Sequence, residues 1–365
     1  MTMSFYVARR FFRAFLMVLG GFAAILFMVE TLEQVRRVSG TDLGMRQATM
    51  LAALNLPGSL FHILPLITIL ATVALFLGLA RTSELVVMRA AGRSGLRMLV
   101  APVLAAMALG ALAVAVIDPI VASTTKRSEE LAAQYQLTES SAVLVGSDGL
   151  WLRQGAGEGQ IVIHARTSNP EGTLLSNVTF MSFLDGSRPE TRYEAAEARL
   201  TPGAWVLKDV KVWNLAGEGN AEAEAETHPT LDIASDLTAD QIRNSFDTPN
   251  VIAIWDLPQF IIELRRAGFS ARAHRVWFQI ELALPLLMGA MVLVGAGLTM
   301  RHARFSQTGL LALMTIVFGF TIFFIRNFAQ VMGENGQIPV ALAAWSPPVA
   351  AILLAVSLVL HLEDG

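Results

Sequence analysis

The sequence predicts an α-helical membrane protein with six transmembrane helices, arranged three plus three around an inserted β-sandwich or jelly-roll domain. Hydrophobic residues make up 54% of the 365 residues and charged residues only 16%, whereas an average soluble domain has about 25% charged residues. Mean hydropathy is +0.53. Of the chain's 27 basic and 30 acidic residues, 10 and 19 fall within residues 126–250, so charge is concentrated in one acidic, soluble insert.

Six stretches are apolar and long enough, or nearly so, to cross a bilayer, which requires roughly 20 consecutive apolar residues. They are 11–29, 60–80, 98–117, 276–300, 308–325 and 338–360. Three spans precede the insert and three follow it. Because six is an even number, we expect both ends of the chain on the same side of the membrane.

The insert has the pattern of short β-strands. Runs of β-branched and aromatic residues are separated by turn clusters at intervals of about ten residues. The expected strands are 149–153, 160–165, 174–184, 191–200 and 204–214. Such spacing is typical of a small sandwich or jelly roll. The alternating Ala/Glu run at 221–226 leaves two interpretations open, a strand with one acidic face or a loop.

Short helices are expected on both sides of these strands. Residues 124–136 continue the third span, and residues 256–267 lead into the fourth. The expected domains are therefore the first three spans in 1–123, the β domain in 124–255, and the connecting helix with the last three spans in 256–365.

Arginine counts favour a cytoplasmic N-terminus. In that orientation the short inner segments carry nine arginines and the short outer loops carry four, as the positive-inside rule requires. Six further basic residues flank the insert and raise the outer count to ten. Charge counting thus leans one way without deciding, and the outer basic residues need a separate explanation.

No catalytic, metal or cofactor site is predicted. The sequence lacks the G-x-x-x-x-G-K-[ST] pattern of a nucleotide-binding P-loop, and its six histidines show no metal-ligand spacing. The absence of cysteine excludes disulfides and thiolate ligands. A net charge of −3 gives no reason to expect nucleic-acid binding. We therefore expect a protein that is not itself an enzyme.

The loop at 81–94, between the second and third spans, carries the most informative motif. Thr82 or Ser83 suits a helix N-cap and Gly92 suits its end, while Glu84 favours the first-turn dipole. The short helix would expose apolar residues, namely Leu85, Val86 and Met88. Two interpretations fit equally, a helix lying on lipid headgroups or a helix docked in the groove of a cytoplasmic partner.

The segment 83–92, SELVVMRAAG, resembles the coupling helix of the LptF/LptG permeases, which export lipopolysaccharide. Gly149-Leu150-Trp151 is similar to the Gly-Leu-Trp that opens the insert of this family. Residues 336–348 resemble the LptG branch more than the LptF branch. The resemblance extends over essentially the whole chain and agrees with three spans, a β-rich insert and three further spans.

The resemblance implies a multi-pass permease of a Gram-negative inner membrane, with both termini cytoplasmic and residues 124–272 periplasmic. Implied partners are an LptF-type permease, an LptB-type ATPase dimer, an LptC-type single-span protein and lipopolysaccharide, with no nucleic acid. The coupling helix would insert into a groove of the ATPase. Its implied coupling residues are Ser83, Glu84, Leu85, Met88, Arg89 and Gly92.

Charged residues extend the first span beyond its apolar part. Glu33 and Arg37 are four residues apart and suit an intrahelical ion pair. The alternative is that Arg36 and Arg37 bind lipid phosphates, since guanidinium forks match phosphate oxygens. The resemblance supports the second interpretation, with basic residues expected here. Glu30 departs from the family pattern, in which a lysine is common at the matching position.

Two charges lie within or at the end of later spans. Glu281 is an intramembrane carboxylate, which is a functional hypothesis by default. The favoured interpretation is nevertheless a structural pairing with Arg272 or Arg275, one or two helical turns away. Arg326, at the outer end of the fifth span, either contacts lipid phosphate or extends toward the interface. The resemblance places a lateral gate at this span but supplies no matching arginine.

Two rival functions stay open. The first is the LptF paralogue of the same transporter. The second, from another class, is a membrane-anchored scaffold or sensor with an external β domain, which would have no ATPase partner. The abundant Met, Phe, Leu and Val of the first, second and fifth spans suit either a cavity for acyl chains or ordinary contact with lipid.

Overall fold

The computed structural model describes most of the chain. The described residues are 2–39, 44–82, 84, 95–135, 143–146, 149–156, 159–169, 172–184, 188–216, 220–235, 237–238, 242, 249–266, 270–300 and 308–364. Two compact units are present. A helical unit takes in Met1–Thr138, Asn250–Trp255 and Arg272–Gly365, and a β-rich unit takes in Glu139–Pro249 and Asp256–Ala271.

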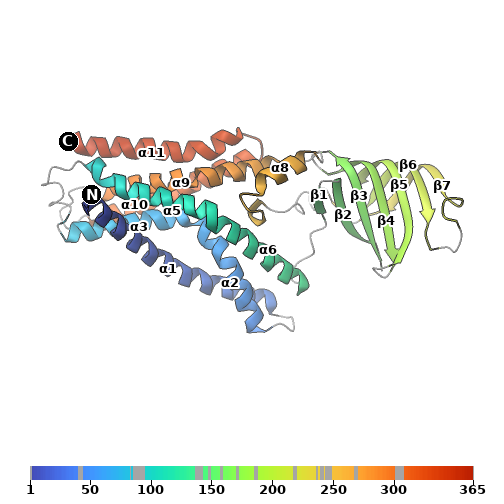
Figure 1. The fold of residues 1–365 in the computed structure, drawn as a ribbon, viewed down its shortest axis with the longest axis horizontal. Helices are drawn as coiled ribbons and strands as arrows, with labels where there is room; N and C mark the ends of the chain where they lie inside the picture. The colour runs from blue at the N-terminus through green and yellow to red at the C-terminus, as the bar shows by residue number, and fades with distance from the viewer. Residues whose placement is uncertain are drawn as a thin grey trace. The chain divides into compact units, whose positions relative to one another are not determined.

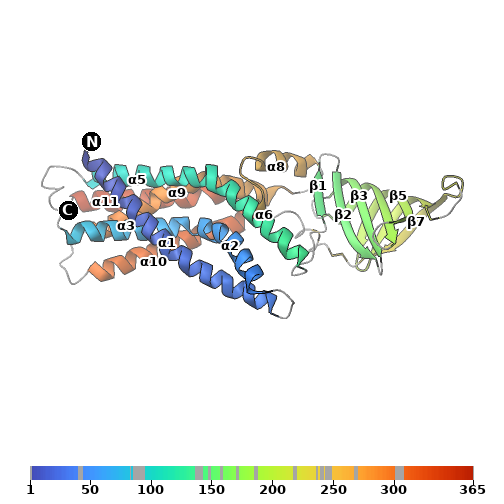
Figure 2. The ribbon, with the colours of Figure 1, turned by 60° about the horizontal axis from the view of Figure 1, so that its bottom comes forward.

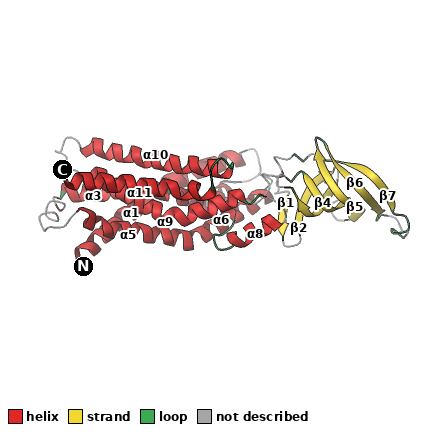
Figure 3. Cartoon of the chain, turned by 90° about the horizontal axis from the view of Figure 1, so that it is seen from above, coloured by secondary structure: helices red, strands yellow, loops and turns green. Residues whose placement is uncertain are grey.

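The helical unit consists of long helices, drawn in red in Figure 3. They are α1 (Thr2–Val38), α2 (Met45–His62), α3 (Leu64–Arg81), α5 (Gly95–Leu112), α6 (Asp118–Gln134), α9 (Arg272–Thr299), α10 (Thr308–Glu334) and α11 (Val340–Asp364). Six described segments have the length and hydropathy of membrane spans, which confirms the predicted number. They are Ser4–Val38, Leu64–Arg81, Arg97–Ala132, Arg272–Thr299, Gly309–Glu334 and Val340–Leu360.

Helix α9 is the centre of this unit, and α3, α5, α10 and α11 pack around it (Figure 1). Close approach depends on small residues, as is usual where helices associate in membranes. A Cβ on Gly110 of α5 would lie 2.7 Å from the Cα of Pro285 in α9. Likewise, a Cβ on Gly333 of α10 would lie 2.6 Å from the Cβ of Ala343 in α11.

Helix α2 is an element that the sequence analysis did not predict. The second predicted span began at residue 60, but the chain turns at Ile63, between α2 and α3. Pro65 follows within the first turn of α3, where proline is tolerated because its missing N–H would have no helical partner. Helix α2 packs against α1 and α6, alongside the far part of α1 in Figure 2.

A π-helical turn, Ala113–Ile117, joins α5 to α6 in one continuous helical segment. Such a turn frees a backbone carbonyl, and here Trp255 Nε1 donates a hydrogen bond to the Ala115 oxygen at 3.2 Å. Asp118 accepts a hydrogen bond from the Ile254 N–H at 2.7 Å. These two hydrogen bonds attach residues 254–255, which follow the β-strands in the chain, to the π-helical turn and the residue after it. The prediction that the third span continues as a helix is confirmed.

Within its described residues, the β-rich unit holds a seven-stranded sheet. Its strands are β1 (Val143–Gly146), β2 (Gly149–Ala156), β3 (Gly159–Ser168), β4 (Leu174–Leu184), β5 (Arg188–Thr201), β6 (Ala204–Asn214) and β7 (Glu226–Ala234). Neighbours along the chain are neighbours in the sheet, and every pairing is antiparallel. The β-rich insert and its five predicted strands are confirmed. However, this sequential order differs from the crossed strand order of a jelly roll, because short turns join each strand to the next.

Strand pairing is interrupted along one line through β4, β5 and β6. Asn177 and Asp209 have left-handed backbones, with φ of 52° and 51°, a conformation that Asn and Asp tolerate better than most residues. The pairing of Ser176 and Val178 with β5 skips Asn177, as the pairing of β5 with β6 skips Asp209. The pairs on either side keep the same register, because Ala196 of β5 is skipped as well, so this interruption is shared by neighbouring strands and differs from a β-bulge in one strand.

One face of the sheet buries an apolar core that includes Phe180, Trp205 and Leu207. Gln154 is a buried polar residue beside this core, and both its amide oxygen and its amide nitrogen form hydrogen bonds. It accepts hydrogen bonds from Trp205 Nε1 at 3.2 Å and Ser235 Oγ at 2.7 Å, and donates to the Ala234 carbonyl at 3.0 Å. A buried amide with every group paired costs little and fixes a single packing arrangement.

Helix α8 (Leu257–Arg266) contributes Leu264 to that core, with Phe260 packed against it. The predicted short helix before the fourth span is thus confirmed, although it belongs to the β-rich unit. Residues 124–138, expected in the β domain, belong to the helical unit instead. The Ala/Glu run at 221–226 forms turns over 221–224 before β7 begins at Glu226. The alternation of Ala and Glu therefore does not mark a strand there.

Candidate functional site

Helix α1 carries candidate phosphate ligands in its last turn. With 37 residues it is about 55 Å long, well beyond the roughly 30 Å hydrocarbon thickness of a bilayer. Arg36 and Arg37 are exposed. Arg37 Nε lies 3.4 Å from Glu33 Oε1, and their side chains are 59% and 46% exposed. The expected intrahelical pair therefore exists, and it leaves both arginines accessible to an anion.

Glu30 lies one helical turn before Glu33 and links α1 to α2. Its carboxylate accepts a hydrogen bond from Ser59 Oγ at 2.8 Å, in a partly buried setting. The residue that departs from the family pattern thus has a local partner of its own. This contact holds α1 and α2 together at a point two helical turns before the exposed arginines of α1.

Arg326 of α10 lies inside the helical unit rather than at its surface. Its guanidinium Nη2 is 3.9 Å from Glu281 Oε1 of α9, and the two side chains are only 6% and 1% exposed. Arg326 also donates to Asn327 Oδ1 at 3.3 Å. Among the described residues, the second carboxylate oxygen of Glu281 has no hydrogen-bond partner. The pair is buried but incompletely satisfied.

The sequence analysis favoured a pairing of Glu281 with Arg272 or Arg275 of its own helix. Glu281 does pair with an arginine, but the partner is Arg326 of α10. Arg272 donates instead to the carbonyl oxygens of Gly333 at 2.6 Å and Ile338 at 2.7 Å. Packing of α10 on α9 supplies Arg326 as the partner across the interface. Spacing along one helix does not contain this information.

At the opposite end of the helical unit, Glu84 is surrounded by donors. Arg10 Nη1 lies 2.7 Å from both carboxylate oxygens, Tyr6 Oη donates at 3.0 Å and Thr82 Oγ1 at 2.8 Å. Arg10 Nη1 also donates to Tyr6 Oη at 2.8 Å. The hydrogen bond from Arg10 is the main cause that holds the pKa of Glu84 below its usual value. Glu84 is therefore ionised and held at neutral pH.

The remaining predicted coupling residues lie outside the described residues. They are Ser83, Leu85, Met88, Arg89 and Gly92. Of the predicted helix at 83–92, the structure describes only Glu84, in helical conformation and two residues after the C-cap of α3 at Thr82. The predicted coupling helix accordingly stays a prediction.

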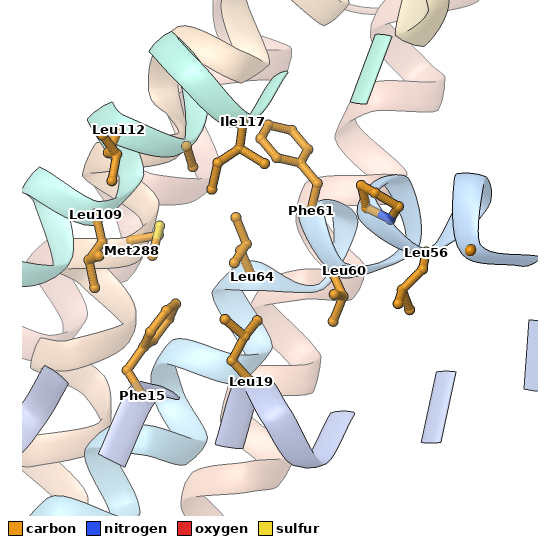
Figure 4. Close-up of a pocket in the computed structure, with 13 residues that line it drawn as sticks. Phe15, Leu19, Leu56, Leu60, Phe61, Leu64, Leu109, Leu112, Ile117 and Met288 are labelled. Carbon is orange, nitrogen blue, oxygen red and sulfur yellow. The ribbon is translucent and has the colours of Figure 1, made fainter. Parts of the chain in front are cut away.

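An apolar cavity of about 270 Å³ opens among α1, α2, α3, α5, α9 and the π-helical turn. Its lining side chains are Phe15, Leu19, Ala53, Leu56, Pro57, Leu60, Phe61, Leu64, Leu109, Leu112, Ala113, Ile117 and Met288. Figure 4 shows these side chains converging from several helices on one space. None carries a charge or a hydrogen-bonding side chain, so the cavity suits hydrocarbon.

The pairing of Arg10 with Glu84 also escaped the sequence analysis. Arg10 was one of three basic residues before the first apolar run, and nothing separated it from Arg9 or Arg13. Its partner Glu84 is 74 residues away. The four-residue spacing of Tyr6 and Arg10 was the available signal, because it puts both side chains on one helix face.

Within the described parts of the chain, no three His, Asp or Glu residues gather as metal ligands would. The charged side chains described above are instead paired with one another, bonded to backbone or hydroxyl groups, or exposed. Three kinds of interaction are therefore available in the helical unit. Arg36 and Arg37 can bind an anion at the C-terminal end of α1, and Arg10 holds Glu84 by an ion pair near its N-terminal end. The apolar cavity can contact hydrocarbon.

Comparison with known proteins agrees with this arrangement. A family model described as lipopolysaccharide export system permease LptF/LptG matches residues 5–361. The chain is 22% identical over 353 residues to the lipopolysaccharide export system permease protein LptG of Escherichia coli (strain K12), covering 96% of this chain and 93% of that protein. It is also 22% identical over 346 residues to LptG of Haemophilus influenzae (strain ATCC 51907 / DSM 11121 / KW20 / Rd), covering 93% and 92%. Since the family model spans nearly the whole sequence, the chain belongs to the LptF/LptG family of lipopolysaccharide export system permeases.

Proposed function

We propose that this chain is the LptG-type permease subunit of an ATP-driven ABC transporter. It extracts lipopolysaccharide from the outer leaflet of the inner membrane and passes it to a periplasmic bridge for assembly in the outer membrane. The family match over residues 5–361 carries this proposal. Six spans with an inserted β unit supply the architecture that such a subunit needs. ATP is hydrolysed by a separate partner subunit.

Both termini face the cytoplasm in this proposal, and residues 124–272 are periplasmic. The arginine excess at the N-terminal end of the helical unit supports the orientation. Partners are an LptF-type permease, an LptB-type ATPase dimer and an LptC-type single-span protein. Only 6% of the apolar window of α1 is buried inside the helical unit, compared with 72% of that of α9. An exposed first span leaves room for neighbouring helices of such partners.

Arg36 and Arg37 hold lipid phosphates at the entrance of the transport path. Their exposure at the end of an extended helix supports this role, because guanidinium forks bind phosphate in bidentate fashion. Glu33 orients Arg37 through their 3.4 Å contact. This role would explain why Arg36 and Arg37 lie at the outer end of α1, where the positive-inside rule does not predict basic residues.

Arg326 joins the phosphate ligands only when α10 shifts. In the structure its guanidinium is buried against Glu281, so a lipid phosphate would have to replace that carboxylate. An exchange of one anion for another keeps the arginine charge compensated throughout, which matters because an unpaired charge in a membrane is costly.

Acyl chains are accommodated by apolar surfaces of the helical unit. The cavity of about 270 Å³ supports this, since every lining residue is apolar. An acyl chain that leaves the bilayer for this cavity exchanges one hydrocarbon environment for another, so the apolar lining accommodates the chain without exposing it to water. The cavity is lined by the first and second spans, as the sequence suggested, together with α2, α5 and α9, whereas none of its lining residues comes from the fifth span, α10.

The segment 83–92 docks in a groove of the ATPase and receives its closing movement. Leu85 and Met88 fill the groove, Glu84 and Arg89 make polar contacts, and Ser83 and Gly92 bound the helix. The movement narrows the space between the two permeases and drives the lipid outward. The β-rich unit then passes acyl chains on to neighbouring β domains.

Copurification in mild detergent tests the class of function. We expect an ATPase and a second permease to accompany this chain, and Glu84→Ala to abolish lipopolysaccharide export in cells. If no ATPase accompanies the chain and Glu84→Ala exports normally, a scaffold or sensor role replaces the transporter.

Photocrosslinkers at positions 36 and 37 test the phosphate ligands. We expect lipopolysaccharide adducts at both positions and fewer at position 353, an exposed leucine within α11 that serves as a bilayer-facing control. Equal labelling at all three positions would remove Arg36 and Arg37 from the site. Single cysteines introduced into this cysteine-free chain would report membrane orientation directly.

A further inference from the structure

The four hydrogen bonds on Glu84 join three parts of the helical unit. Arg10 and Tyr6 belong to α1, Thr82 is the C-cap of α3, and Glu84 begins the segment that leads to α5. Each ionised carboxylate has about four lone-pair directions available to donors. Arg10 takes one direction on each oxygen, while Thr82 and Tyr6 take one each. The position of Glu84 is therefore set from within the chain.

The contact between Arg10 and Glu84 is short and partly sheltered. Its distance is 2.7 Å, and the two side chains are 28% and 32% exposed. Charge-assisted hydrogen bonds of this length are about twice as strong as neutral ones. Arg10 also lies 5.9 Å from the centre of the Tyr6 ring, which adds a cation–π contact. Tyr6 thereby orients the guanidinium as well as binding Glu84 directly.

Helix α1 extends without interruption from this cluster to the exposed arginines. It runs from Thr2 to Val38, with Tyr6 and Arg10 near one end and Arg36 and Arg37 in the last turn. A continuous helix transmits a displacement along its axis because its backbone hydrogen bonds resist stretching. A movement imposed on Glu84 therefore has a direct mechanical path to the proposed phosphate ligands.

From this geometry we infer that Tyr6 and Arg10 are positioning residues for energy coupling: they attach the segment beginning at Glu84 to α1, so that movement of this segment shifts α1 and its lipid-binding end. The inference rests on the proposed function, which supplies the movement. It gives Glu84 a role inside the chain, and the proposed contact of Glu84 with the ATPase would replace one of the donors that hold it in the structure. Arg10 needs no contact with the ATPase to perform this role.

The test uses the complete transporter reconstituted in proteoliposomes containing lipopolysaccharide. The variant Arg10→Gln removes the charge, Arg10→Lys keeps it, and Tyr6→Phe removes only a hydroxyl. Arg13→Gln is the matched control, because it removes an exposed arginine from the same end of α1. The quantity measured is lipopolysaccharide released per ATP hydrolysed, together with recovery and thermal stability of the complex.

We expect Arg10→Gln to lower the lipid-to-ATP ratio by about tenfold, the effect of losing one charged hydrogen bond, with recovery of the ATPase unchanged. Tyr6→Phe should lower the ratio by about twofold to fivefold, less than Arg10→Gln, because the ion pair between Arg10 and Glu84 remains. Arg10→Lys should restore part of the ratio, and Arg13→Gln should match the unmodified complex. A residue that only supports the fold would instead lower recovery and stability.

A second readout follows α1 itself. A fluorophore on Leu32→Cys, an exposed position in the last third of α1, should change its emission when ATP binds. Combining it with Arg10→Gln should abolish that change. A normal lipid-to-ATP ratio in Arg10→Gln, or an unchanged Leu32 response, would overturn the inference. Loss of the ATPase from Arg10→Gln alone would overturn it as well, because Arg10 would then act in docking. Absence of an ATPase from the unmodified complex would instead overturn the proposed function.

Discussion

Two ion pairs in the helical unit use the same chemical groups in opposite ways. Arg10 and Glu84 meet at 2.7 Å with about a third of each side chain exposed, and every carboxylate direction is used. Arg326 and Glu281 meet at 3.9 Å, almost fully buried, with one carboxylate oxygen lacking a hydrogen-bond partner among the described residues. The first pair has short hydrogen bonds and is partly exposed to solvent, whereas the second is too long for a hydrogen bond and is almost completely buried.

The difference teaches where each pair can act. An exposed pair contributes little to stability but can fix the position of a segment. In a buried pair each charge depends on the other, because desolvation of an unpaired ion costs several kcal/mol. Glu281 and Arg326 should therefore dominate the stability of the helical unit, and Arg10 and Glu84 should dominate coupling. The following changes separate these two roles.

Removing one member of the buried pair should have the largest effect on stability. Glu281→Leu leaves Arg326 without a counter-charge and should lower the free energy of unfolding by about 3–5 kcal/mol. Thermal unfolding in detergent measures the loss. Glu130→Leu, which breaks an exposed pair with Arg127, is the matched control and should change little. A stable Glu281→Leu protein would show that Arg326 finds another partner.

Removing both members should have a smaller effect than removing either one. The double variant Glu281→Leu/Arg326→Leu replaces two buried charges by hydrocarbon, a change that is often neutral or stabilising by about 1–4 kcal/mol. We expect unfolding midpoints at or above that of the unmodified protein. Export should nevertheless fall if Arg326 exchanges Glu281 for lipid phosphate. Full export by a stable double variant would exclude Arg326 from the lipid site.

Breaking the exposed pair should cost little stability. Arg10→Gln should lower the free energy of unfolding by about 1 kcal/mol or less, the usual worth of a solvent-accessible ion pair. The cost should shrink further in about 1 M salt, where the screening length is about 3 Å. Thermal unfolding at low and high salt measures both effects. A loss comparable with that of Glu281→Leu would contradict the contrast between the pairs.

Lowering the pH should remove the stabilisation that the pair of Arg10 and Glu84 contributes to the folded state. Because Arg10 holds the pKa of Glu84 below its ordinary value of 4.5, folding is favoured when the carboxylate is ionised. That stabilisation is complete above pH 4.5 and disappears as pH falls through the lower pKa of the folded state. The difference in unfolding midpoint between Arg10→Gln and the unmodified protein should vanish over this acidic range. A difference that vanishes near neutrality instead would contradict the assignment.

The smallest effect belongs to the pair at the other end of α1. Glu33→Gln breaks an exposed contact between residues four apart, worth about 0.3–0.5 kcal/mol. Stability should be nearly unchanged, while lipopolysaccharide crosslinking at position 37 should fall because Arg37 loses its orientation. Unchanged crosslinking would show that Arg37 binds without help from Glu33.

Periodicity in the sequence predicted the fold because hydrophobic length and turn spacing are local properties. The six spans and the strands from β2 to β6 follow from such patterns. Helix α2 escaped because its apolar residues continue into α3 and the turn at Ile63 carries no strong signal. Strand β7 escaped because it is mostly exposed, with polar residues throughout its first half.

Partnerships between distant residues were beyond these patterns. Glu84 was singled out from its motif, but its contact with Arg10 depends on how α1 packs beside the end of α3. Glu281 was recognised as an unusual carboxylate, yet its partner came from α10 rather than its own helix. A local pattern reports which face of a helix is apolar, whereas pairing depends on which helices become neighbours.

The most direct test of the proposed function is ATP-dependent lipid release from a purified complex in proteoliposomes. The account predicts that this chain, a second permease and an ATPase together release lipopolysaccharide to a periplasmic acceptor protein when ATP is added. Release should stop when this chain is omitted or when ATP is replaced by a non-hydrolysable analogue. Release of equal size without this chain, or without hydrolysis, would contradict the assignment of the chain as a permease driven by a separate ATPase.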